Sequence, residues 1–201
     1  MTRRTITPIL IASTLALAGC VTAPGPVEVT RFVEPSATER LGSGTIFVTA
    51  APGEPGDSLE MSAYTAAVAG ELRGLGYTEA ARTGADQVAE VRFQRYTLQA
   101  DGSRSPVSVG VGGSTGSYGS GVGLGIGINL GGGAKDKVGT EMAVTIRDRA
   151  TGQNLWEGRA NFAVAENSPL ADRRSSAQTV AAALFSDFPG NNGETVEIEV
   201  P

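Results

Sequence analysis

Cys20 is the only cysteine of this 201-residue chain, and it limits how any folded part can be held together. No disulfide can form within one copy, so the fold has to be stabilised by packing alone. The chain also contains no histidine. This excludes Ser-His-Asp and Cys-His nucleophile activation and any metal cluster built from Cys and His, so we expect no cofactor and no metal.

The residues before Cys20 have the pattern of a secretory signal. Arg3 and Arg4 give a positive start, and a mostly apolar run follows as far as Leu17. That run is shorter than the roughly 20 apolar residues that a membrane-spanning helix needs. A basic start followed by a short apolar region is typical of a removable segment, so we predict a signal peptide over residues 1–19.

Leu17-Ala18-Gly19-Cys20 resembles a bacterial lipobox. In proteins with that motif the cysteine thiol is diacylated, the chain is cut before the cysteine, and the new amine is acylated. The resemblance implies lipidation of Cys20 and attachment to a membrane on the periplasmic side of a Gram-negative cell envelope. Several acyl chains make such an attachment stable. By resemblance to lipoprotein sorting, Val21 in place of an aspartate favours the outer membrane over the inner one.

The predicted mature chain is acidic. Loss of Arg3 and Arg4 leaves 14 basic residues against 21 acidic ones, a net charge of −7. An acidic surface repels phosphate backbones, so we expect no nucleic-acid partner.

The mature part divides into a spacer and one domain. Residues 20–43 contain Pro24, Pro26 and Pro35 and predict an extended linker from lipidated Cys20. The pattern over 44–192 predicts an α+β domain with an antiparallel sheet of about five to six strands and two helices on one face. Residues 193–201 are predicted to be a C-terminal tail or an edge strand. The predicted strands cover 45–49, 88–98, 140–149 and 155–164, and the predicted helices cover 60–74, capped by Ser58, and 173–187.

A glycine-rich hairpin is predicted over residues 105–133. From Gly121 apolar residues alternate with glycine, so one face of a strand would be apolar and the other nearly bare backbone. No helical pattern follows, which argues against a nucleotide-binding glycine loop. The hairpin could fold over its own sheet, pair with a partner or a second copy, or insert into a bilayer as part of a ring of subunits. Its candidate interaction residues are Tyr118, Val122, Leu124, Ile126, Ile128 and Leu130.

Several features together resemble domain of unknown function 4136, a family of bacterial envelope lipoproteins. They are the lipobox, the first strand and helix, Ala85-Asp86, the glycine-rich middle, the hairpin from Asp148 to Gly158, and Phe188-Pro189-Gly190. The resemblance spans residues 17–192. It implies a periplasmic α+β domain without known catalytic residues. Within the hairpin we expect Gly152, Trp156 and Gly158 to be structural, with a large ring beside a position that admits close packing.

These features predict a lipid-anchored, non-catalytic binding or structural module with an envelope protein or a second copy as partner. The alternative is an oligomeric export or pore-assembly component that uses residues 110–133. An envelope hydrolase is disfavoured, because it would need a cleft lined by Glu141 or Asp148 with a raised carboxyl pKa. Glu54, Asp57 and Glu60 are further candidates for such chemistry, but they lie on predicted loops or polar faces.

Overall fold

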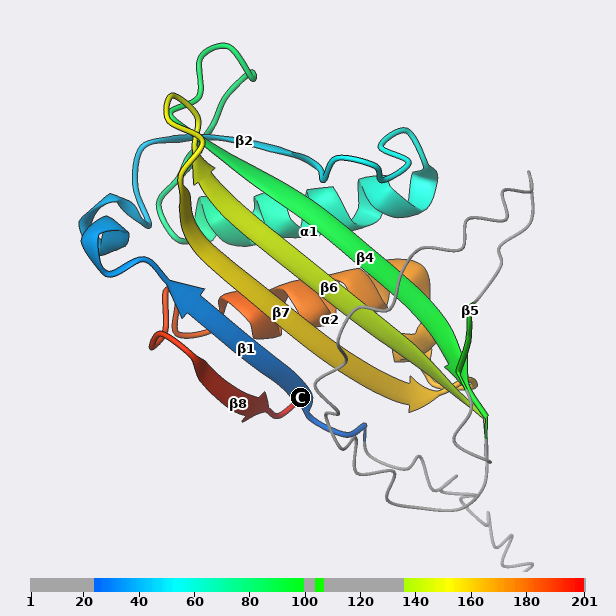
Figure 1. Cartoon of the computed structure of the whole chain (residues 1–201). Helices are drawn as coiled ribbons and strands as arrows, with labels where there is room; N and C mark the ends of the chain where they lie inside the picture. Colours follow the sequence, from blue (N-terminus) through cyan, green and yellow to red (C-terminus); the bar gives the residue numbers. More distant parts are fainter. Residues whose placement is uncertain (1–23, 100–103, 107–135, 201) are drawn as a thin grey trace, which may run out of the picture.

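A computed structural model describes residues 24–99, 104–106 and 136–200 (Figure 1). Cys20 and residues 107–133 of the predicted hairpin lie outside the described residues.

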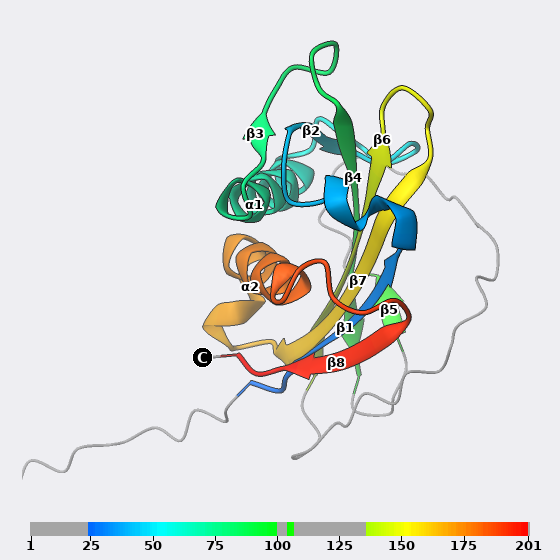
Figure 2. The same ribbon diagram turned by 90° about the vertical axis from the view of Figure 1, so that its left-hand side faces the viewer.

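Eight strands form one sheet, with the order β3-β2-β4-β6-β7-β1-β8 and with β5 also paired to β4. Helices α1 and α2 pack on one face of this sheet (Figure 2). Short 3-10 helices precede β2 and α2. The strands are β1 Val27–Val33, β2 Thr45–Ala50, β3 Thr78–Glu79, β4 Gln87–Leu98, β5 Arg104–Pro106, β6 Lys137–Asp148, β7 Asn154–Ala165 and β8 Glu194–Ile198; the helices are η1 Pro35–Arg40, α1 Leu59–Gly74, η2 Pro169–Ala171 and α2 Arg173–Phe185.

The predicted class, a sheet with two helices on one face, is confirmed. The sheet has more strands than the five to six predicted, and not all of its strands are antiparallel. β2 runs parallel to both β3 and β4, so the sheet is mixed and not purely antiparallel. The reason lies in the connection: α1 crosses over the sheet between β2 and β4, and a crossover of this length returns the chain in the same direction.

The structure also differs from the predicted domain limits. Residues 27–33, expected in the spacer, form β1 between β7 and β8. Val27, Val29, Arg31 and Val33 all face the core, so the pattern has a period of two. The prolines on both sides and an arginine at an inward position obscured this strand. At the other end of the chain β8 takes the edge-strand alternative for residues 194–198.

Local signals account for the helix ends. The Ser58 side chain accepts a hydrogen bond of 3.0 Å from the amide of Met61, which caps α1 as predicted. Asp172 caps α2 by accepting bonds from the amides of Arg174 and Ser175. α2 ends at Phe185, two residues before its predicted end.

The core lies between the two helices and the long central strands β4, β6 and β7, each of 12 residues. Alternate residues of β7 face the core as predicted, namely Trp156, Gly158, Ala160 and Phe162, and Val164 continues the pattern. The other face of the sheet carries mainly polar and charged side chains.

Candidate functional site

The structure places only part of the predicted site residues. Cys20, Tyr118 and the alternating residues Val122, Leu124, Ile126, Ile128 and Leu130 lie outside the described residues. Gly152, Trp156 and Gly158 are described, and each has a packing or turn role.

Trp156 fills the space between β7 and the end of α2. Its ring centroid lies 5.3 Å from that of Phe185 and 5.2 Å from that of Phe188. Its indole Nε1 donates a 2.9 Å hydrogen bond to the carbonyl oxygen of Pro189. A Cβ at Gly158 would come within 2.2 Å of Trp156 Cη2. Gly158 therefore leaves the room that the indole ring occupies.

Gly152 closes the turn between β6 and β7 with a φ of 73°, a conformation that glycine adopts without strain. Asp148 organises the same turn by accepting hydrogen bonds from the amides of Ala150 and Thr151. The Thr151 bonds hold the pKa of Asp148 below its ordinary value. A hydrolytic acid needs the opposite shift, so Asp148 has the environment of a turn-capping residue.

The carboxylates considered for acid–base chemistry lie on different elements. Glu54 pairs with Arg92 at 2.9 Å, and Glu60 pairs with Arg95 at 3.3 Å. Glu141 lies on the helix-free face of β6. Within residues 24–99, 104–106 and 136–200, no group of three or more acidic residues is arranged to hold a metal ion.

Arg31 is a buried charged residue that the sequence interpretation missed. It is 2 % exposed and reaches from β1 to the carboxyl end of α2. Its guanidinium donates hydrogen bonds to the carbonyl oxygens of Ala183, Leu184 and Ser186, at 3.3, 3.2 and 2.6 Å. Burial lowers the pKa of Arg31, while Asp187 and Glu194 partly offset this effect. Arg31 thus satisfies carbonyls that a helix end leaves without partners, and its charge is favourable there.

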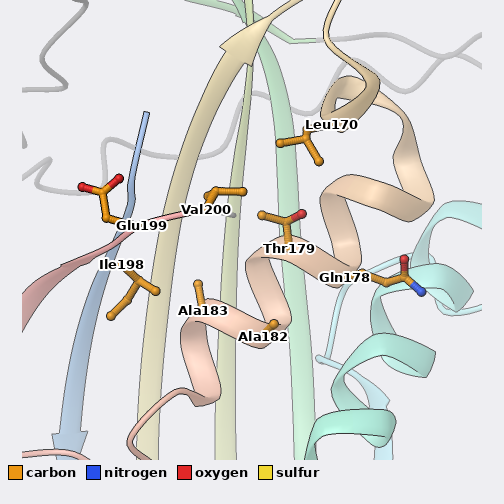
Figure 3. Close-up of a pocket in the computed structure, with 8 residues that line it drawn as sticks. All are labelled: Leu170, Gln178, Thr179, Ala182, Ala183, Ile198, Glu199 and Val200. Atoms are coloured by element: carbon orange, nitrogen blue, oxygen red, sulfur yellow. The ribbon is translucent and has the colours of Figure 1, made fainter. Parts of the chain in front are cut away.

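A groove lies between α2 and the C-terminal strand (Figure 3). Its volume is about 400 Å³. One wall is a single side of α2, because residues 178 and 182, and likewise 179 and 183, are one helical turn apart. The other wall is β8 with the two residues that follow it, and the lining is mainly apolar. The lining residues are Leu170, Gln178, Thr179, Ala182, Ala183, Ile198, Glu199 and Val200.

Acidic side chains lie along the edge of the sheet beside this groove. Glu28 on β1 and Glu197 on β8 are direct cross-strand partners. Glu199 follows two residues later and is exposed. Burial, and then repulsion from Glu197, raise the pKa of Glu28 above its ordinary value. No ion pair among the residues that the structure describes involves Glu28, Glu197 or Glu199. This edge is therefore apolar towards the helices and negative towards the open face.

None of the described helices combines the length and the apolar character that crossing a membrane requires.

Solved structures resemble the fold at low sequence identity. A PDZ domain protein from Parabacteroides distasonis matches with a TM-score of 0.51 and 13% identity, over 87% of this chain and 39% of that one. The PelC dodecamer from Paraburkholderia phytofirmans matches with a TM-score of 0.47 and 12% identity, over 83% of this chain and 99% of that one. At such identities the likeness concerns the fold alone.

One curated relative, an uncharacterised protein from Zymomonas mobilis, is 33% identical over 64 residues. That stretch covers 32% of this chain and 24% of the relative. A profile of the family described as a domain of unknown function, DUF4136, matches residues 37–190. β1 and β8 lie outside the matched range, so the sheet edge that forms one wall of the groove is not part of the match. The chain belongs to the DUF4136 family.

Proposed function

We propose that this protein is a lipid-anchored envelope lipoprotein whose domain acts as a non-catalytic binding or structural module on the periplasmic side of the outer membrane. The observation that carries the proposal is Leu17-Ala18-Gly19-Cys20 at the end of a basic and then apolar N-terminus. Acyl chains on Cys20 would tether the domain without a membrane-spanning segment.

The geometry of the domain supports a binding role more than a catalytic one. The groove beside α2 has a mainly apolar lining, and among the described residues that line it Glu199 is the only one with a carboxylate. Asp148, one of the two residues on which a hydrolase would depend, caps its own turn and has a lowered pKa. An apolar groove next to a negative strand edge suits the recognition of another polypeptide.

The anchor is tested by the mass of the protein purified from membranes of a Gram-negative host. We expect a chain that begins at Cys20 and carries the added mass of three acyl chains with the glyceryl linker. Cys20→Ser should give a chain without that mass and release it from the membrane fraction. An uncleaved N-terminus with a free thiol would refute the proposal. The Val21→Asp variant should instead be found in the inner membrane of a host that sorts lipoproteins by this position.

A second candidate function is an oligomeric export or pore-assembly component that uses residues 110–133. The observation that favours it is the alternation of glycine with Val122, Leu124, Ile126, Ile128 and Leu130. A run of this length and period is typical of strands that cross a bilayer in closed barrels. Deletion of residues 110–132 should then abolish assembly but leave the unfolding midpoint unchanged. A wild-type protein that is monomeric in native mass spectrometry with detergent would refute this candidate.

A further inference from the structure

We propose that β8 accepts an added strand from a partner polypeptide whose residues alternate between apolar and basic. The apolar side chains would enter the groove beside α2, and the basic ones would face Glu28, Glu197 and Glu199. This inference rests on the proposed function, because it names the partner chemistry of the same binding module.

The edge itself is available for pairing. β8 pairs with β1 along one side, and no other strand of the described residues pairs with it. An edge strand presents unpaired amide and carbonyl groups in a row, which is what strand addition uses for affinity. A strand added there would lie about 4.8 Å from β8.

The groove provides the specificity for apolar side chains. Val196, Ile198 and Val200 point towards the helix layer and pack against the core only in part. The facing wall is Gln178, Thr179 and Ala182 of α2 (Figure 3). Every second side chain of an added strand would project into this groove and cover the half-buried apolar residues of β8.

The charges select the other half of the partner's residues. The side chains of Glu197 and Glu199 are exposed, and Glu28 lies next to Glu197 across the two strands. Like charges directly opposite each other destabilise a sheet, whereas opposite charges stabilise it. A lysine or arginine on the added strand opposite Glu197 would compensate both carboxylates.

The same charges disfavour a second copy of β8 as the occupant. An antiparallel pair of β8 strands would bring Glu197 and Glu199 of one copy close to those of the other. Charged side chains on an edge strand are a known means by which proteins prevent self-pairing of sheets. A basic partner has no such obstacle.

The test uses the purified full chain in a non-ionic detergent and a labelled, end-blocked peptide of alternating lysine and valine. We expect saturable binding that weakens as salt is added, because the screened charges contribute to it. A peptide of alternating glutamate and valine should not bind. The lysine–valine peptide with N-methyl groups on alternate residues should lose at least about tenfold in affinity, because its backbone donors are blocked.

Two matched variants locate the site. Ala182→Glu fills the groove from an exposed position on α2 and should weaken binding at least about tenfold. Ala66→Glu makes the same change at an exposed position on α1 and should leave binding unchanged. Glu197→Lys should reverse the preference towards the glutamate–valine peptide. Unchanged Trp156 emission verifies that each variant is folded.

Three results would overturn the inference. One is equal binding to the Ala182→Glu and Ala66→Glu variants, and another is equal binding of the N-methylated peptide. The third is evidence that the chain itself occupies the groove. Such evidence would be peptide binding that occurs only after deletion of residues 110–132, or protection of β8 by a second copy of the chain in a dimer. Loss of peptide binding leaves the mass of the lipidated N-terminus unchanged, so failure here is distinct from failure of the proposed anchor.

Discussion

Replacement of Arg31 by alanine should destabilise the fold by about 3–5 kcal/mol, because it removes the buried donor group that completes the end of α2. Arg31 donates to Ala183, Leu184 and Ser186, and to the Ser186 hydroxyl at 3.1 Å. These partners all lie at the carboxyl end of α2 and the residue that follows it.

Two contributions set the magnitude. The substitution removes two methylenes of the buried stem, Cγ and Cδ, which account for about 1.6 kcal/mol of apolar burial at about 0.8 kcal/mol each. Each helix carbonyl left without a donor costs about 1–3 kcal/mol, and water entering the vacated space recovers part of that. The sum exceeds the loss that single substitutions commonly cause, so we expect a value in the upper part of that distribution, about 3–5 kcal/mol, which is where loss of a buried hydrogen-bond network falls.

Denaturant unfolding followed by tryptophan emission is the appropriate assay, because Trp156 is the only tryptophan and contacts Phe185 at the same helix end. Arg31→Lys should cost less than alanine but remain destabilising, because an ammonium cannot reproduce the planar set of donors. Arg159→Ala is the matched control: this arginine is exposed on β7 and should change stability by no more than about 0.5 kcal/mol. If the Arg31→Ala and Arg159→Ala variants unfold at the same denaturant concentration, the role assigned to Arg31 is wrong.

Three further predictions concern packing and acid stability. Gly158→Ala should cost about 1–3 kcal/mol, because its Cβ would lie 2.2 Å from the neighbouring indole ring, whereas Gly74→Ala at the exposed end of α1 should leave stability unchanged or raise it by up to about 1 kcal/mol. Urea titrations of the two variants measure the change in unfolding free energy. Equal losses for Gly158→Ala and Gly74→Ala would contradict the prediction. Thr140→Val and Ser176→Ala should each cost about 1–3 kcal/mol, because their buried hydroxyls are hydrogen-bonded at 2.9 Å, and the double variant should cost less than the sum; strict additivity in a double-mutant cycle would argue against the pairing. Asp148→Asn should lower stability at neutral pH but not in strong acid. The folded pKa of Asp148 lies below its ordinary 3.8, so its stabilisation is complete above that value and is lost as the pH falls through the folded pKa. Unfolding midpoints at about pH 7 and about pH 3 measure the difference, and an equal gap at both pH values would contradict the prediction.

Much of the fold followed from local patterns because local forces decide those parts. Strands β6 and β7 could be predicted from alternating apolar residues joined by a tight turn at Gly152, and their register pairs Val144 with Gly158. The start of α1 followed from Ser58, since a capping side chain acts within one turn. Gly158 leaves the room that the Trp156 ring occupies, two residues away on the same strand.

The parts that sequence reasoning missed depend on residues far apart in the chain. Arg31 fell within the predicted linker, because its partners begin 152 positions later at Ala183. The parallel pairing of β2 with β4 depends on where α1 packs, which the strand patterns do not encode. The groove lies between α2 and β8, and β8 takes its place at the sheet edge only because it pairs with β1.

The sequence by itself determined the class of fold, most of the helices and strands, and the family, because alternation, capping residues and turns act over a few neighbouring positions. It also carries the motif at Cys20 on which the proposed anchor depends. Only the tertiary structure decided that residues 27–33 belong to the sheet, that a buried arginine completes a distant helix, and that an apolar groove lies beside a negative strand edge. Those features arise from cross-strand register and helix placement, which are fixed when the whole core packs at once.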